Sequence, residues 1–173
     1  FIHALGVSCN LKILSQAAGA SGFFNVSPDP DGNLRRVPLI IEHKGELYPS
    51  LALATLMQYL NVTDVLLKAD HGAVESLCLN KTVIPLTAEG DMLIRFRGKS
   101  KTFNYLSAAE ILSNRIPKEK IKGKIVFVGT SASGMKEFKS TPFDPIFPGV
   151  EIHATIVDNI LKKDFLSRPK WAS

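Results

Sequence analysis

The sequence predicts one α/β domain, with a mixed β-sheet around a buried central strand at residues 124–128 and helices on both faces. A length of 173 residues fits a single compact domain, so residues 1–173 are treated as one unit. Residues 124–128 form an unalternating apolar run between two glycines, which is typical of a strand covered on both faces. Helical periodicity at residues 50–60 and from residue 149 onward supplies the covering helices.

In the first half of the chain, short segments rich in Pro, Gly and Ser separate the predicted elements. They are a helix at 11–18 capped by Asn10, antiparallel strands at 23–26 and 34–41, and a helix at 50–60. Residues 28–33 are rich in Pro, Asp and Gly, so they predict the chain reversal between the two strands. Pro38 favours an edge position or a bulge, and Ser50 opens a helix that is apolar around most of its circumference.

The second half predicts a hairpin, a further strand, a short helix, the central strand and a last helix. These elements are expected at 75–79, 82–86, 92–96, 108–114, 124–128 and from 149 onward. Ser107 and Glu110 match a capping box, in which the serine side chain accepts from the third helical amide. Residues 61–70 are ambiguous between strand and helical turn.

Composition excludes several classes of protein. Hydrophobic residues make up 45% and charged residues 21%, which argues against disorder. The formal net charge is +5, but the basic residues are scattered among acids, so nucleic acid is not an expected partner. No apolar stretch approaches the roughly 18–20 residues of a membrane-spanning helix.

The two cysteines leave the redox compartment open. Cys9 and Cys78 are far apart and have no metal-ligand spacing. Two isolated buried thiols are favoured over one long-range disulfide, and both alternatives remain.

The segment after the predicted central strand fails the tests for known catalytic and nucleotide-binding loops. It begins at Gly129 and has Met135 between Gly134 and Lys136, so the lysine is out of register for a phosphate loop. Ser133 occupies the position where a nucleophile elbow needs its second glycine. The dinucleotide fingerprint also lacks its middle glycine. No cofactor is therefore expected.

The same segment nevertheless suggests a small-molecule site. Hydroxyls, amides and cations follow the carboxyl end of a predicted buried strand, where open α/β sheets place their ligands. The candidate ligand-binding residues are Thr130, Ser131, Ser133, Lys136, Thr141, Glu151 and His153. The alternative is that the serines satisfy loop amides and that Glu151 and His153 cap and pack the last helix. The ligand is unidentified, and an anionic or polar one fits best.

Two further groups of residues predict structure, not chemistry. Asp29, Asp31 and Gly32 resemble the opening of a calcium loop, but Pro30 and the missing later ligands favour a turn. Arg35 and Arg36 are expected on opposite faces of a strand, so at most one should pair with that turn. No histidine has the spacing of a metal ligand, and no metal site is expected.

The motifs, taken in order, resemble the CHASE2 family of sensory extracellular domains associated with cyclases and histidine kinases. The resemblance covers nearly all of residues 22–171. It rests on Gly-Phe-Phe-Asn at 22–25, Asp-Pro-Asp-Gly-Asn-Leu-Arg-Arg-Val-Pro-Leu at 29–39, Tyr-Pro-Ser-Leu-Ala-Leu at 48–53, Gly-Lys-Ile-Val-Phe-Val-Gly at 123–129, Thr-Pro at 141–142 and Pro-Gly-Val-Glu-Ile-His-Ala at 148–154.

The resemblance implies an extracytoplasmic (periplasmic or extracellular) input module of a bacterial membrane receptor. Such receptors carry membrane helices on both sides of the module and an adenylate or guanylate cyclase, histidine kinase or Ser/Thr kinase output. The family names no catalytic residue, so the chain itself is not expected to be an enzyme. The resemblance further implies that the family's N-terminal part is missing from residues 1–173, so that this chain is its C-terminal two-thirds, with residues 166–173 as a juxtamembrane tail.

Two functional hypotheses follow. The first is a sensor that binds a small ligand at residues 130–141 and transmits a conformational bias toward the membrane. The second is a ligand-free structural domain that holds two receptors together as a homodimer, motivated by the broad apolar circumference of the helix at 50–60. An enzyme that uses the loop hydroxyls ranks last, because no pair of base and nucleophile is visible.

Overall fold

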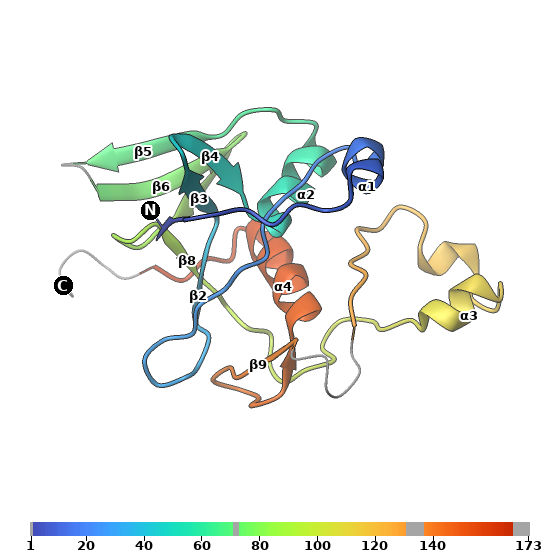
Figure 1. Cartoon of the computed structure of the whole chain (residues 1–173). Helices are drawn as coiled ribbons and strands as arrows, with labels where there is room; N and C mark the ends of the chain where they lie inside the picture. Colours follow the sequence, from blue (N-terminus) through green and yellow to red (C-terminus); the bar gives the residue numbers. More distant parts are fainter. Residues whose placement is uncertain (1, 71–72, 131–136, 168–173) are drawn as a thin grey trace.

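The computed structural model describes residues 2–70, 73–130 and 137–167 (Figure 1). Its order of elements is β1 (Ile2–His3), α1 (Lys12–Ala17), β2 (Arg36–Pro38), β3 (Ile40–His43), β4 (Glu46–Pro49), α2 (Leu51–Leu60), β5 (Leu66–Asp70), β6 (Ala73–Leu79), β7 (Thr82–Pro85), β8 (Asp91–Leu93), α3 (Ala108–Leu112), a 3₁₀ turn (Lys118–Lys120), β9 (Phe138–Lys139), β10 (Phe147–Pro148) and α4 (Gly149–Lys162).

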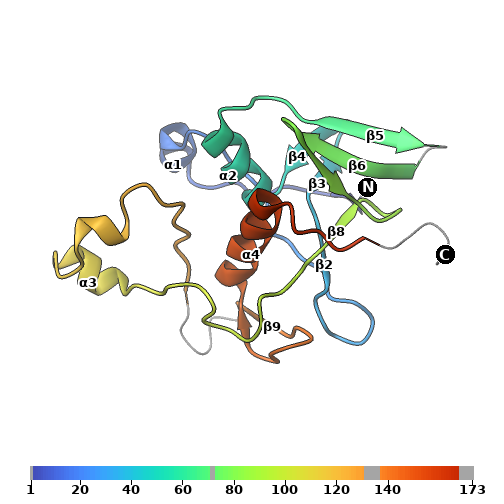
Figure 2. The same cartoon turned by 180° about the vertical axis from the view of Figure 1, so that it is seen from behind.

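The strands form small mixed sheets, which confirms the α/β class. β1 pairs parallel with β3, and β3 pairs antiparallel with β4. β5, β6 and β7 form an antiparallel meander, while β2 pairs with β8 and β9 with β10. Figures 1 and 2 show α2 and α4 side by side next to these strands, with α3 standing apart.

The buried central strand predicted at 124–128 is wrong. Residues 125–128 belong to no strand or helix, and no described residue makes a backbone hydrogen bond to residues 125–129. Exposure alternates along them: Ile125 and Phe127 are partly buried, whereas Val126 is 51% and Val128 is 88% exposed. Helix cover on both faces of one sheet is also not observed among the described residues, because the strands form separate small sheets and the two helices with buried residues, α2 and α4, pack against each other (Figure 1).

This geometry predicts that Val128→Lys leaves stability almost unchanged. A side chain that is 88% exposed loses little contact on substitution, so we expect a change within about 0.5 kcal/mol in the free energy of unfolding. Urea denaturation of the parent and the variant measures it. A loss of several kcal/mol in the free energy of unfolding would show that Val128 is buried, as the predicted central strand requires.

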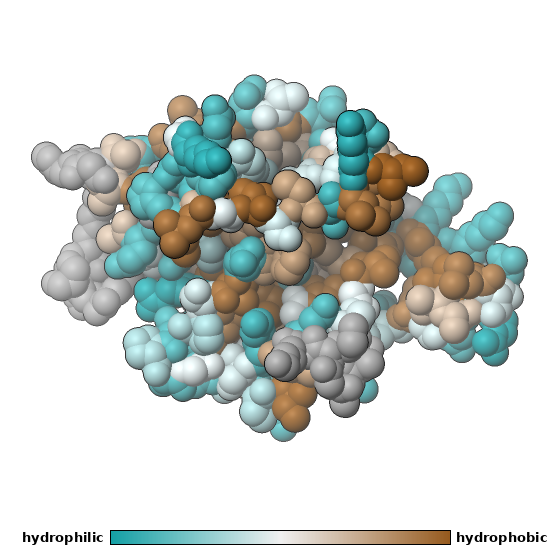
Figure 3. All heavy atoms as spheres, viewed as in Figure 1, coloured by the Kyte–Doolittle hydropathy of each residue, from teal (hydrophilic) through white to brown (hydrophobic). Residues whose placement is uncertain are grey.

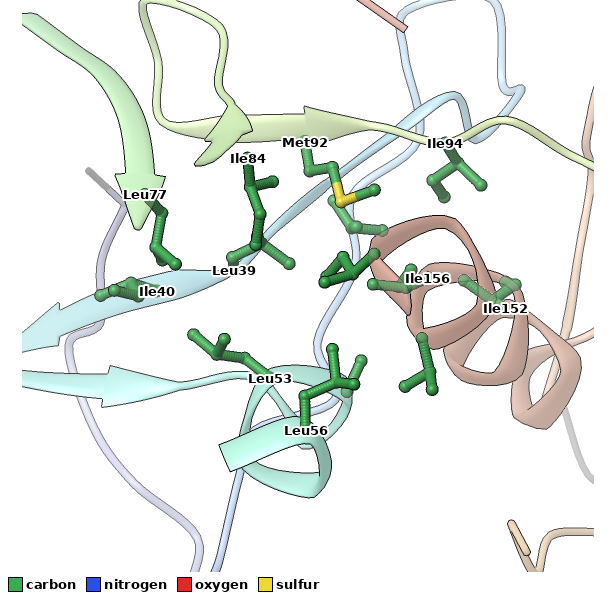
Figure 4. Packing of buried hydrophobic residues seen from close by; sticks show 14 of the residues in the cluster. Leu39, Ile40, Leu53, Leu56, Leu77, Ile84, Met92, Ile94, Ile152 and Ile156 are labelled. Carbon is green, nitrogen blue, oxygen red and sulfur yellow. The ribbon is translucent and has the colours of Figure 1, made fainter. Parts of the chain in front are cut away.

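The hydrophobic core lies where α2 and α4 meet the strands (Figure 4). Leu53 and Leu56 of α2 are fully buried, and Ile152 and Ile156 of α4 are 1% and 2% exposed. The strands and adjoining turns contribute Leu39, Ile40, Leu77, Ile84 and Met92. The apolar circumference of α2 is therefore largely used in the core.

A buried amide fixes the orientation of α4. Asn159, which is fully buried, accepts from the Arg95 amide through Oδ1 at 2.8 Å and donates through Nδ2 to the Arg95 carbonyl at 3.0 Å. Arg97 forms ion pairs with Asp158 of α4 and with Asp164 just after it. The C-terminal end of α4 is thus held at a fixed place relative to the segment that follows β8.

Several local predictions are confirmed and others are corrected. Ser50 caps α2 by accepting from the Leu53 amide at 3.3 Å. Pro38 ends β2 in a two-stranded sheet, where every strand is an edge. The strand predicted at 34–41 is split into β2 and β3, and that at 23–26 is reduced to a single bridge between Phe23 and Ser50.

Three further expectations also differ from the structure. Ser107 precedes α3 but makes no side-chain cap, so only the position of the capping box is confirmed. Cys9 is exposed rather than buried, and both it and Cys78 are free thiols. No helix within the described residues is long and apolar enough to cross a membrane.

Candidate functional site

The structure describes four of the seven expected site residues, and these four have separate roles. Ser131, Ser133 and Lys136 lie outside the described residues. The Thr130 hydroxyl donates to the Glu137 carboxylate. Thr141 is 4% exposed; its hydroxyl donates to the Asp144 carbonyl at 3.0 Å and accepts from the Asp144 amide at 3.1 Å. Thr141 therefore closes a turn.

Glu151 anchors a loop to the first turn of α4. It is 2% exposed, and its carboxylate accepts from the amides of Lys101 and Thr102 at 2.8 and 2.9 Å. The Tyr105 hydroxyl donates to the same carboxylate at 2.6 Å. Burial, together with this bond, raises the pKa of Tyr105 well above its usual range. The carboxylate is thus engaged by its own chain.

His153 is the expected site residue with an unmet hydrogen-bonding group. Its Nδ1 is buried and has no hydrogen-bond partner among the described residues. The ring stacks on Phe127, with centroids 6.2 Å apart and planes at 26°. Burial lowers the pKa of His153 below its ordinary value, so the imidazole is neutral at neutral pH.

The lowered pKa of His153 predicts a stability that depends on pH. As pH falls from about 7 to about 5, the unfolded chain protonates this histidine before the folded chain does, so folding stability falls. His153→Gln should make that fall shallower. Urea unfolding across this range measures both proteins, and an equally steep fall in the variant would contradict a buried neutral imidazole.

His153 lines a groove of about 440 Å³ at the start of α4, here called the α4 groove. Its apolar wall consists of Phe24, Val26, Leu51, Phe127, Val128, Val150 and Ile152. Its polar groups are Asn25, Glu137, Lys139 and His153, with Gly129 and Gly149 completing the lining. This combination of an apolar wall with few polar groups is typical of small-molecule sites.

Two glycines let the backbone approach α4 closely enough to form this groove. A Cβ on Gly129 would lie 2.6 Å from Cβ of Val150, and one on Gly149 would lie 2.9 Å from the Glu137 carbonyl. The Gly149 amide donates to that carbonyl at 2.8 Å. Gly129 therefore serves close packing on α4, which explains a glycine at this position without phosphate binding.

The charged residues of the groove are Glu137 and Lys139, two positions apart on extended chain that enters β9. Neither takes part in an ion pair in the described part of the chain, so their charged atoms lie more than 4.0 Å apart. Side chains at i and i+2 of an extended chain share a face. The groove thus presents one carboxylate and one ammonium group.

A second hollow, of about 240 Å³, lies on the other flank of Phe127. Its one charged residue, Asp158, is already paired with Arg97 and Lys162. The α4 groove is therefore the better candidate site.

The Asp-rich turn is structural, and one prediction about it is wrong. Arg35 and Arg36 both pair with Asp29, each at 3.0 Å, whereas at most one was expected to do so. Strand alternation does not separate them, because β2 begins only at Arg36. Arg35 also holds Asp31, which keeps the pKa of Asp31 well below its usual range. Within the described residues, no cluster of side chains could hold a metal ion.

Sequence reasoning missed most of the groove. Phe24, Phe127 and Val150 appear in the motifs that carry the family resemblance, but they were not expected to form a site. Glu137 was also not predicted as a site residue. The sequence feature that could have pointed to it is Lys139, a residue of opposite charge two positions later. The groove joins segments that are distant in sequence, so no local motif marks it.

A comparison with protein families supplies the identity of the domain. The family model of the CHASE2 domain matches residues 3–173. The match begins well before residue 22, where the resemblance in the sequence begins. No curated protein and no solved structure matches the chain. The chain belongs to the CHASE2 family, whose members are sensory extracellular domains of signalling receptors and not catalytic domains.

Proposed function

We propose that this chain is the extracytoplasmic sensor of a bacterial transmembrane receptor and binds a small ligand in the α4 groove. The receptor's output is an adenylate or guanylate cyclase, a histidine kinase or a Ser/Thr kinase, and membrane helices flank the sensor. The observation that carries the proposal is the groove itself, in a chain that belongs to a sensory family.

The position of the groove suggests how binding becomes a signal. It is bounded by the first turn of α4, by Leu51 at the start of α2 and by Phe127 and Val128. A ligand there contacts all three segments and shifts the receptor only if it binds one arrangement of them better than another. α4 runs from the groove to Lys162, and the proposed juxtamembrane tail at 166–173 follows it in the sequence.

The test is isothermal titration calorimetry of the chain against pools of small anions and metabolites. Phe24→Ala removes an aromatic wall that is 72% exposed, so folding should be preserved while affinity falls at least tenfold. Tyr59→Ala, at a residue that is 60% exposed and outside the α4 groove, is the matched control. Equal binding by both variants would place the site elsewhere.

A second candidate function is a ligand-free dimerisation domain of the same receptor, which the apolar segment at 125–129 favours. Its backbone groups are unpaired within the described structure, and Val126 and Val128 are exposed beside it. Unpaired backbone groups of this kind can pair with the same segment of a second copy. Sedimentation should then show a dimer that Val126→Pro disrupts, and a monomer at high concentration excludes this function.

A further inference from the structure

The apolar side chains that line the α4 groove indicate the apolar part of its ligand. Phe24 and Phe127 present aromatic rings, and Leu51 and Val150 add aliphatic surface. A volume of about 440 Å³ is within the range of roughly 300–1,000 Å³ that small-molecule sites occupy. The occupant therefore carries an apolar side chain of the size of an aromatic or branched aliphatic group.

The charged side chains of the groove indicate which charges the ligand carries. Among the described residues, Lys139 has no ion-pair partner, and the Glu137 carboxylate accepts only the Thr130 hydroxyl, through Oε2. A ligand with a carboxylate alone would be attracted by Lys139 and repelled by Glu137, and an amine alone would meet the reverse. A ligand that carries both charges satisfies both side chains.

The remaining polar groups of the groove add hydrogen bonds without adding charge. Asn25 lies in the lining, and the Nδ1 of His153 is buried without a partner. Because burial lowers the pKa of His153, its ring does not disturb the balance of one positive and one negative charge at neutral pH.

We propose that the α4 groove binds a free α-amino acid with an apolar side chain. Lys139 takes the carboxylate, Glu137 takes the ammonium group, and the side chain lies between Phe24 and Phe127. This inference rests on the proposed sensor function and names the class of ligand for the same site.

Three compounds that differ only in their charges test the proposal. L-phenylalanine has both charges, 3-phenylpropionate lacks the ammonium group and phenethylamine lacks the carboxylate. In calorimetric titrations of the chain, L-phenylalanine should bind at least tenfold more tightly than either analogue. Equal binding of 3-phenylpropionate and L-phenylalanine, or no binding of L-phenylalanine, would overturn the inference.

Charge-removing variants then assign each contact. Lys139→Gln should weaken L-phenylalanine at least tenfold without weakening phenethylamine, and Glu137→Gln should weaken L-phenylalanine without weakening 3-phenylpropionate. Lys118→Gln and Glu110→Gln, at charged residues outside the groove, should change nothing. An affinity for L-phenylalanine unaffected by Lys139→Gln or by Glu137→Gln would overturn the assignment.

The class of ligand and the location of the binding site can be tested separately. If a metabolite other than an amino acid binds and Phe24→Ala abolishes that binding, the ligand class is wrong and the sensor site stands. If L-phenylalanine binds equally well to the parent and to Phe24→Ala, both the site and the proposal built on it are wrong.

Discussion

Ile156→Ala is expected to lower the free energy of unfolding by about 2–5 kcal/mol. Ile156 is 2% exposed and lies on α4, facing the core that Leu53 and Leu56 of α2 complete (Figure 4). Removing its side chain loses buried apolar surface and leaves a cavity that a close-packed interior fills only in part. Urea denaturation followed by circular dichroism measures the loss.

Leu161→Ala is the matched control for this substitution on the same helix. Leu161 is 42% exposed, so we expect it to cost less than about 1 kcal/mol. A small effect at Ile156, or equal effects at both positions, would contradict the packing of α4 against α2 and the strands.

Glu151→Ala is expected to cost about 3 kcal/mol, because several donors lose a buried charged acceptor at once. The amides of Lys101 and Thr102 and the hydroxyl of Tyr105 all donate to this carboxylate. Their desolvation is no longer compensated after the substitution. The loop at 101–105 should also lose its attachment to α4, which faster amide hydrogen exchange there would show.

The tyrosine provides a separate readout of the same cluster. In Glu151→Ala the pKa of Tyr105 should fall toward the ordinary value of about 10, since one cause of its elevation is removed. Ultraviolet titration of the phenolate resolves this change, with Tyr105→Phe identifying the signal among the three tyrosines. An unchanged titration in Glu151→Ala would show that the contact with Tyr105 is absent.

The longer helices could be predicted because their signals are local. The apolar periodicity at 50–60 and the serine cap at Ser50 correspond to α2, and the pattern from Gly149 onward corresponds to α4. Both helices bury an apolar face in the core, so the pattern and the packing agree.

The segment at 124–128 could not be predicted in the same way, because a strand is defined by its partner. Five apolar-rich positions show that the segment favours an extended chain, but not which backbone lies beside it. The structure places Ile125 and Phe127 toward α4 and leaves Val126 and Val128 exposed. In the space-filling view, further apolar surface lies over α1 and around α3 (Figure 3).

The candidate site could be predicted only in part, for a related reason. His153 was expected near a ligand and does line the groove, whereas Glu151 lies two residues earlier and binds a loop instead. The remaining lining comes from residues 24–26, Leu51, residues 127–129 and the chain entering β9. Only the tertiary structure brings these segments together.

Amide hydrogen exchange of the chain with and without saturating L-phenylalanine tests most directly whether the α4 groove is the recognition site. The account predicts slower exchange at residues 127–129 and 149–153, and no change in the Asp-rich turn around Asp29. Protection confined to other segments, or none despite binding measured by calorimetry, would contradict it.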